Sequence, residues 1–177
     1  MTAPAKKRIT LIHHSASGGA RALVSAFCAG AAHAAGVHVI TRSADVCTRT
    51  DLLASDAIIF ASPENFGYMA GTMKAMFDRL FYACMSDTTA LGGGIDSLLA
   101  GRAYSTLICA GNDGTGAAQS IDRIVTGWRM KKVHPGIIAR RIGGAAGSSR
   151  GELAAADIEA CESLGELFAE ALSLGAW

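Results

Sequence analysis

The chain has 177 residues, of which half are hydrophobic and 18% are charged, and its formal net charge is +1. This length and composition suit one domain with a sizeable core. The near-neutral charge argues against nucleic acid, an anionic membrane or an acidic partner as the main ligand, and we interpret the basic Lys6-Lys7-Arg8 cluster as a solvated lead-in.

The first predicted elements are a strand, a loop and a helix. Ile9 to Ile12 is a short apolar run with β-branched residues, and the small residues Ser15-Ala16-Ser17-Gly18-Gly19 follow it closely. Ala20 to Ala35 has apolar residues near helical spacing and ends at Gly36, which predicts a helix. A second strand is expected over Val37 to Thr41.

The middle of the chain predicts a third strand and a second long helix. Asp56 to Ala61 is apolar on both faces, as is typical of a strand buried in a parallel sheet. Ser62 to Gly67 contains Pro and Gly and is expected to form a loop. The helix that follows carries an apolar stripe from Met69 to Cys84, and its methionines are expected in the core; Gly92-Gly93-Gly94 predicts another loop.

The last part repeats the alternation of strand and helix. The predicted elements are a strand over Ala103 to Ala110, a glycine-rich loop over Gly111 to Gly116, a helix over Ala117 to Trp128, a strand over Val133 to Ile142 and a helix over about Glu152 to Leu174. Pro135 interrupts the fifth strand, so we expect that strand at an edge. Gly143 to Gly151 is expected to be a linker of small residues.

Five strands that alternate with helices predict an α/β fold for residues 1–177 as a single domain. The sheet is expected to be parallel, with right-handed crossovers and helices on both faces. In the doubly wound strand order 2-1-3-4-5, the loops after the first, third and fourth strands meet at one end of the sheet, where ligands of such folds bind. Those three loops are rich in Gly, Ser, Asn and Thr, and the loop after the second strand is not.

The first of these loops has the chemistry of a phosphate-binding loop. Ser15 and Ser17 offer hydroxyl donors, and Gly18 and Gly19 let backbone amides approach an oxyanion. The helix that follows adds unpaired N–H groups and the positive end of its dipole. The loop contains no Lys and only Arg21 lies close, which favours a permanently bound monoester; a tight strand-to-helix turn is the alternative interpretation.

Other motifs give no competing site. No Gly-x-Gly-x-x-Gly follows the first strand, and no Lys-Ser or Lys-Thr follows Gly111 to Gly116. Gly147 to Gly151 matches Gly-x-Ser-x-Gly, but no His follows His134, so a hydrolase triad is not expected. The five cysteines form no Cys-x-x-Cys and the histidines show no metal spacing, so we expect no metal site. The absence of a signal-peptide pattern and of a spanning apolar segment predicts a soluble, cytoplasmic protein without membrane insertion.

Two stretches carry a resemblance to known flavoproteins. His14-Ser15-Ala16-Ser17-Gly18-Gly19-Ala20-Arg21 resembles the phosphate loop of flavodoxins. Ser62 to Arg79, which reads Ser-Pro-Glu-Asn-Phe-Gly-Tyr-Met-Ala-Gly-Thr-Met-Lys-Ala-Met-Phe-Asp-Arg, is similar to the flavin-binding loop and following helix of NAD(P)H-dependent FMN reductases and WrbA-type quinone reductases. The resemblance implies a flavodoxin-like three-layer sandwich.

The resemblance also implies roles for particular residues. The FMN phosphate would be held by Ser15, Ser17, Gly18, Gly19 and Ala20. The flavin ring would be contacted, largely through backbone groups, by Pro63, Glu64, Asn65, Phe66 and Gly67. The other side of the ring would be closed by Gly111, Asn112, Asp113, Gly114 and Gly116. No catalytic side chain is implied, since the flavin carries the chemistry.

The function implied is an FMN-dependent oxidoreductase that passes electrons from NADH or NADPH to a quinone or similar small-molecule acceptor. A homodimer or homotetramer is also implied. Two alternatives stay open: an electron carrier of the flavodoxin type, against which the near-neutral charge argues, and a binding module without flavin turnover. Ala20 favours the second alternative, because flavodoxins commonly have a hydroxyl residue at that position.

Overall fold

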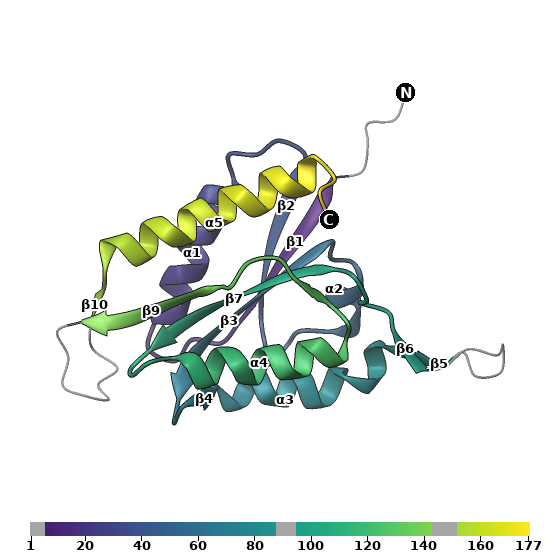
Figure 1. Cartoon of the computed structure of the whole chain (residues 1–177), viewed down its shortest axis with the longest axis horizontal. Coiled ribbons are helices and arrows are strands. Elements are labelled where there is room, and N and C mark those ends of the chain that lie inside the picture. Colours follow the sequence, from purple (N-terminus) through teal and green to yellow (C-terminus); the bar gives the residue numbers. More distant parts are fainter. Residues whose placement is uncertain (1–5, 88–94, 143–151) are drawn as a thin grey trace.

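The computed structural model describes residues 6–87, 95–142 and 152–177 (Figure 1). Its largest sheet has the strand order β10-β9-β7-β3-β1-β2. The bounds are β1 Lys7–His13, β2 Val37–Ser43, β3 Ala57–Asn65, β4 Tyr68–Met69, β7 Ala103–Ala110, β8 Lys131–Lys132, β9 Ile137–Ile142 and β10 Glu152–Leu153. The neighbouring pairs from β2 to β9 are parallel, so the predicted order 2-1-3-4-5 of five parallel strands is confirmed.

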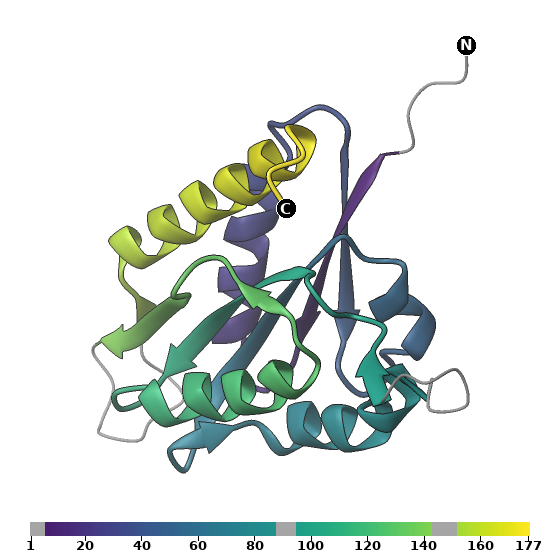
Figure 2. The ribbon, with the colours of Figure 1, turned by 45° about the vertical axis from the view of Figure 1, so that its right-hand side comes forward.

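Helices cover both faces of this sheet (Figures 1 and 2). Helices α1 (Gly19–Ala31) and α5 (Ala155–Ser173) pack on one face around Phe27 and Phe168. The opposite face is covered by α2 (Arg49–Leu53), α3 (Gly71–Leu80) and α4 (Thr115–Gly127). The structure is therefore the three-layer α/β sandwich that the alternating pattern predicts.

The core explains why the strands read as continuous apolar runs. Every residue of β7 is buried, and so are the first six residues of β3, because both strands lie between two helical layers. Met73, Met76 and Phe77 of α3 are also buried, as expected for core residues. At the crossing of α1 and α5, Gly30 and Gly165 lie against the backbone of the other helix, where a Cβ would collide.

The structure corrects several boundaries. Ser62 to Asn65 do not form a loop: they continue β3, which turns back into β4. By Pro63 the pairing of β3 with β1 has ended, so β3 is paired there with β7 alone and tolerates a residue without an N–H. Met69 therefore belongs to β4 and not to the helix, which begins at Gly71.

The carboxyl-terminal region differs in similar ways. Residues 131–142 form two short strands, β8 and β9, separated around Pro135 and Gly136, rather than one. β9 is the last parallel strand, and only its final residues Arg141 and Ile142 pair with the antiparallel β10, so the expected edge position of the fifth strand is confirmed except at this end. The last helix begins at Ala155 because Glu152 and Leu153 are strand residues. The predicted loops at 92–94 and 143–151 lie outside the described residues.

Four further elements have no counterpart in the predictions. They are α2, the 3-10 turn η1 (Tyr82–Cys84), and a two-stranded antiparallel sheet of β5 (Met85–Asp87) and β6 (Ile95–Ser97). A capping box at Thr48 and Asp51 starts α2. All of them lie away from the carboxyl ends of the parallel strands (Figure 1). None of the helices in the described part of the chain is long and apolar enough to cross a membrane.

Candidate functional site at the carboxyl ends of the strands

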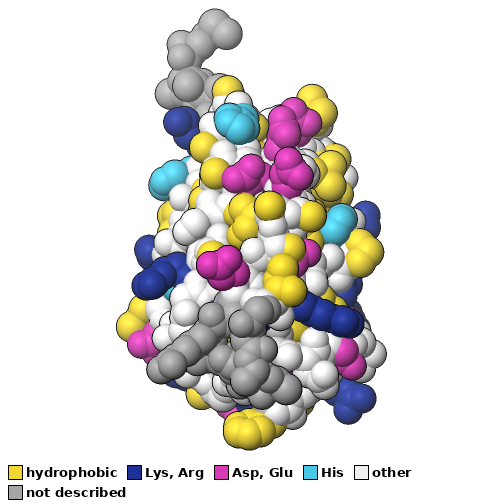
Figure 3. All heavy atoms as spheres, turned by 90° about the vertical axis from the view of Figure 1, so that its left-hand side faces the viewer, with side chains coloured by type: hydrophobic (Ala, Val, Ile, Leu, Met, Phe, Trp, Pro, Cys, Tyr) yellow, Lys and Arg dark blue, Asp and Glu magenta, His cyan; other side chains and the backbone are white. Residues whose placement is uncertain are grey.

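The three polar loops lie together at one end of the sheet. They follow β1, β3 and β7, which are adjacent and parallel. Figure 3 looks onto the end to which β7 and β9 point and shows basic side chains at both sides of this face. The topology therefore gathers the predicted site residues as the strand order requires.

The loop after β1 is shaped by Gly18. Its φ of 91° is left-handed, so it makes a turn that glycine adopts without strain, and α1 begins at the next residue. Ser15 Oγ accepts a hydrogen bond of 3.2 Å from the backbone N–H of Arg21. The first-turn amides of Gly19 and Ala20 have no acceptor within the helix. Ser15, Ser17 and these first-turn amides form a small group of donors at the start of α1, which we call the cradle.

The hydroxyl of Ser17 has a partner from a distant strand. Arg141 of β9 donates from Nη2 to Ser17 Oγ at 2.8 Å. In both contacts the serine oxygen is the acceptor, and within the described ranges neither hydroxyl donates a hydrogen bond, so both can donate to a bound group. Sequence reasoning did not find Arg141, and only the sheet topology brings it to this loop.

Ala20 differs from the other residues of this loop. Its side chain is buried in the core beneath the loop, so among its groups the backbone N–H is the hydrogen-bond donor that a phosphate could use. The Cβ of a Ser or Thr at position 20 would lie in this apolar core. The structure thus shows how the loop can be built with Ala at this place, using two serines and the helix amides.

The segment after β3 is a tight hairpin. Asn65 pairs with Tyr68, which leaves Phe66 and Gly67 as a two-residue turn with φ values of 54° and 73°. Positive φ at both central residues is the pattern of a type I′ turn. Such a φ is unusual for a bulky residue, and the Phe66 ring is fully exposed at the tip. An aromatic ring is thereby presented to solvent at the rim of the site.

Glu64 joins the second loop to the third. Its carboxylate accepts the N–H of Asn112 at 2.8 Å and the N–H of Gly114 at 3.2 Å. Asp113, between them, accepts the N–H and the hydroxyl of Thr115 at 2.7 and 2.9 Å. These bonds lower the pKa of Asp113. Both carboxylates therefore act on the backbone of the third loop, which holds it in a fixed shape.

The start of α4 lies against the hairpin. Gly114 caps the helix with a φ of 74°, and Gly116 packs on the carbonyl of Gly67 so closely that a Cβ would collide with it. Behind the hairpin, Ser62 Oγ accepts the N–H of Ala70 at 2.9 Å. Gly116 thus packs closely on the hairpin and is only partly exposed, whereas Gly111 and Asn112 are exposed.

His13 and His14 end β1 beside the first loop. Burial lowers the pKa of His13, and the positive charges of His14 and Arg21 lower it further. Among the described residues, His13 Nδ1 is a buried nitrogen without a hydrogen-bond partner. His13 is therefore an uncharged neighbour of the cradle at neutral pH, and it lies within reach of the positive charge of Arg21.

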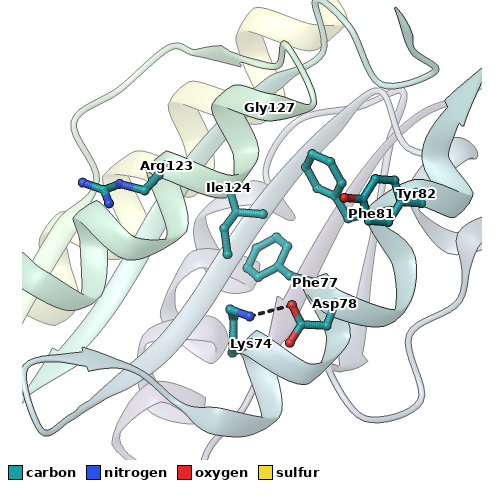
Figure 4. A pocket seen from close by; sticks show the side chains of 8 residues that line it. All are labelled: Lys74, Phe77, Asp78, Phe81, Tyr82, Arg123, Ile124 and Gly127. Atoms are coloured by element: carbon teal, nitrogen blue, oxygen red, sulfur yellow. Dashed lines mark hydrogen bonds and ion pairs between the residues drawn. The ribbon is translucent and has the colours of Figure 1, made fainter. Parts of the chain in front are cut away.

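Two cavities lie near the site on the side of α3 and α4. One of about 240 Å³ adjoins the hairpin and is lined by Gly67, Tyr68, Gly116, Gln119, Ser120 and Arg123. The other, of about 300 Å³, lies between the two helices, where the Lys74–Asp78 ion pair faces Phe77, Phe81 and Ile124 (Figure 4). Arg123 borders both, so the two cavities are neighbours.

The residues present fit a flavin mononucleotide. The cradle after β1 offers hydroxyl and amide donors at a helix N-terminus, which suits a phosphate group. The loops after β3 and β7 are tied together by Glu64 and carry exposed backbone and one aromatic ring, which suits a flat heterocycle. The site therefore has a polar end and a planar end, as an FMN molecule does.

Comparison with solved structures supports this fold. A flavodoxin from the domain Archaea superposes with a TM-score of 0.70 at 18% identity, over 94% of this chain and 99% of that one. A WrbA-like flavodoxin from Agrobacterium tumefaciens gives 0.68 at 15% identity, over 93% and 96%. The flavodiiron core of Flv1 from Synechocystis sp. PCC6803 gives 0.69 at 17% identity, over 97% of this chain but 37% of that one.

A comparison with curated proteins gives no significant match. The family model described as NADPH-dependent FMN reductase matches residues 47–143, which include the hairpin after β3 and the loop after β7. That match covers more than half of the 177 residues. The chain therefore belongs to the NADPH-dependent FMN reductase family.

Proposed function

We propose that the protein is an FMN-dependent oxidoreductase that uses NADH or NADPH as electron donor and a quinone or similar small molecule as acceptor. The observation that carries the proposal is the joining of the three loops at one end of the sheet, with a phosphate cradle beside a carboxylate-tied pair of ring-binding loops. Membership of the FMN reductase family supports the same cofactor and reaction class.

The proposed roles of the chain's own groups follow from their positions. Ser15 and Ser17 donate their hydroxyl hydrogens to the phosphate, together with the first-turn amides of α1. Glu64 keeps the hairpin and the third loop at a fixed separation, so that Asn65 to Gly67 and Gly111 to Gly114 border the ring. Bound FMN would supply the two-electron chemistry, taking a hydride from the nicotinamide and returning the electrons to the acceptor.

The surroundings of the hairpin suggest where the second substrate enters. Phe66 is exposed at the tip, and the cavity of about 240 Å³ beside it carries Tyr68, Gln119 and Arg123. An aromatic rim with one guanidinium suits a flat acceptor or a nicotinamide with its phosphates nearby. No side chain is assigned as a catalytic acid or base.

We further propose that residues 1–177 form one domain, that the protein is cytoplasmic, and that it assembles as a homodimer or homotetramer. The two helical layers on a single sheet support the first statement. All five cysteines are free, as suits a reducing compartment. The exposed Tyr82 beside the groove of α3 and α4 supports a contact between copies.

Two steps test the proposed function. The purified protein is mixed with FMN and gel-filtered, and its visible spectrum is recorded; retained flavin bands are expected. Anaerobic addition of NADH or NADPH is then expected to bleach these bands, and a quinone to restore them. Retained FMN that neither nucleotide reduces would contradict the reductase and favour an electron carrier, whereas a protein that releases all FMN would favour a binding module.

A further inference from the structure

The side chain of Arg141, a residue of β9, bonds the loop after β1 from across the sheet. It lies on β9, 124 residues from Ser17, yet its Nη2 donates to Ser17 Oγ at 2.8 Å. The guanidinium also packs against the backbone of Gly19. A Cβ at position 19 would collide with Arg141 Nη2 and with Cys109 Sγ. Glycine at position 19 therefore leaves the space that the guanidinium uses.

A second guanidinium approaches the same loop from the helix. Arg21 Nη2 lies 4.0 Å from where a Cβ on Gly18 would be. Its charge is felt at His13, at the end of β1. Arg21 forms no ion pair with a residue in the described part of the chain. Gly18 and Gly19 thus each have a cationic group beside them, one from α1 and one from β9.

The acidic groups near this loop belong to other segments of the chain. Residues 14–21 contain no Asp or Glu. Asp45 is the acidic group that faces His13 and His14, and it bonds Ser43 Oγ; Asp113 faces Arg140 and bonds Thr115. The cradle therefore combines two guanidinium groups with two hydroxyls, which are groups that recognise a dianion.

We propose that Arg141 and Arg21 form a cationic clamp that selects the terminal phosphate monoester of FMN. This deepens the proposed function and rests on it. A phosphate monoester carries close to two negative charges at neutral pH. Riboflavin lacks the phosphate, and in FAD the same phosphate is joined by an anhydride bond to a second phosphate and carries only one negative charge. The clamp makes the site specific for FMN over both of these flavins, with Arg141 as the specificity-determining residue.

The size of the effect follows from the chemistry of the contact. Removing one charge-assisted bond to a phosphate weakens binding by roughly 10- to 100-fold. Arg141→Gln is therefore expected to raise the Kd for FMN by that factor and to leave the Kd for riboflavin unchanged. Arg141→Lys keeps the charge without the planar fork, so an intermediate loss is expected. Lys131→Gln, exposed on β8 at the amino end of β7, is the charge-matched control.

The experiment measures FMN, riboflavin and FAD binding by flavin fluorescence for the wild type and the three variants. Circular dichroism checks that each is folded. In a second readout without flavin, inorganic phosphate is titrated while the Tm is followed. We expect phosphate to raise the Tm of the wild type and of Lys131→Gln, and to raise that of Arg141→Gln much less.

The outcomes separate the clamp from the proposed function. Equal FMN affinities of the wild type and Arg141→Gln would overturn the clamp while FMN binding stands. Equal weakening of FMN and riboflavin would also overturn it, because that pattern indicates a change in loop shape. If the wild type binds no flavin but Arg141 governs its phosphate-dependent Tm, Arg141 binds an anion at this loop, and both the selection of FMN and the FMN function are overturned. No effect of either ligand would overturn both.

Discussion

The carboxylate of Glu64 connects two of the three loops, so its removal tests how the site is held together. In Glu64→Ala the N–H groups of Asn112 and Gly114 lose their acceptor. Asn112 is exposed and can bond water, whereas Gly114 is buried at the start of α4 and has less access to it. The loop after β7 should therefore loosen from the hairpin while the sheet stays intact.

The expected cost can be worked out from these two bonds. A hydrogen bond to a charged group contributes about 1.5–3 kcal/mol when it is buried. One of the two bonds here is open to solvent, so a total of about 1–2 kcal/mol is the expected loss in the free energy of unfolding. For a protein of this size that loss lowers the Tm by roughly 2–8 °C. Glu64→Gln keeps one acceptor oxygen and should lose about half as much.

The assay compares urea unfolding and FMN binding of Glu64→Ala, Glu64→Gln and the control Glu166→Ala, which removes an exposed carboxylate from α5. We expect the order of stability control, Gln, Ala, and an FMN affinity that falls in the same order. An unchanged stability of Glu64→Ala would refute the role of the carboxylate as the connection between the loops.

Three further changes test other parts of the account. Phe66→Asn places Asn-Gly in the type I′ turn, so we expect the free energy of unfolding to rise by about 0.5–1 kcal/mol. Because the exposed ring is lost, the affinity for flavin or acceptor should fall. A lower Tm would contradict the turn assignment. Gly165→Ala forces a Cβ into the backbone of α1, so thermal unfolding should show a loss of about 1–3 kcal/mol, whereas the exposed Ser163→Ala should change little. The pKa of His13 is lowered in the folded protein by burial and by its cationic neighbours, so the unfolded chain binds more protons at acidic pH. The free energy of unfolding should therefore fall as pH drops below about 6.5. In urea unfolding, His13→Gln should flatten this pH dependence, and an unchanged slope would contradict the role given to His13.

The fold was predictable because strands that are buried on both faces have continuous apolar sequences. The strand expected over Ala103 to Ala110 has the same bounds in the structure, and every one of its residues is buried. The loops that follow β1, β3 and β7 were identified by their small and polar residues, and the parallel order places them together. Their assignment to FMN contacts remains a prediction.

The parts that were missed depend on contacts between distant residues. Pro63 and Gly67 indicated a loop, yet pairing with Tyr68 and Met69 extends the strand to Asn65. Helix α2 was not predicted because it has only five residues, too few to show helical periodicity, although Thr48 and Asp51 form a capping box at its start. Arg141 gives no local sign of its place, since only the position of β9 next to β7 carries it to Ser17.

The central claim is that FMN binds across the three loops at the carboxyl ends of β1, β3 and β7. Hydrogen exchange followed by mass spectrometry, with and without a saturating concentration of FMN, tests it most directly. The account predicts slower exchange in residues 15–20, 63–67 and 111–116 and little change elsewhere. Protection confined to the groove between α3 and α4, or no protection with FMN bound, would contradict it.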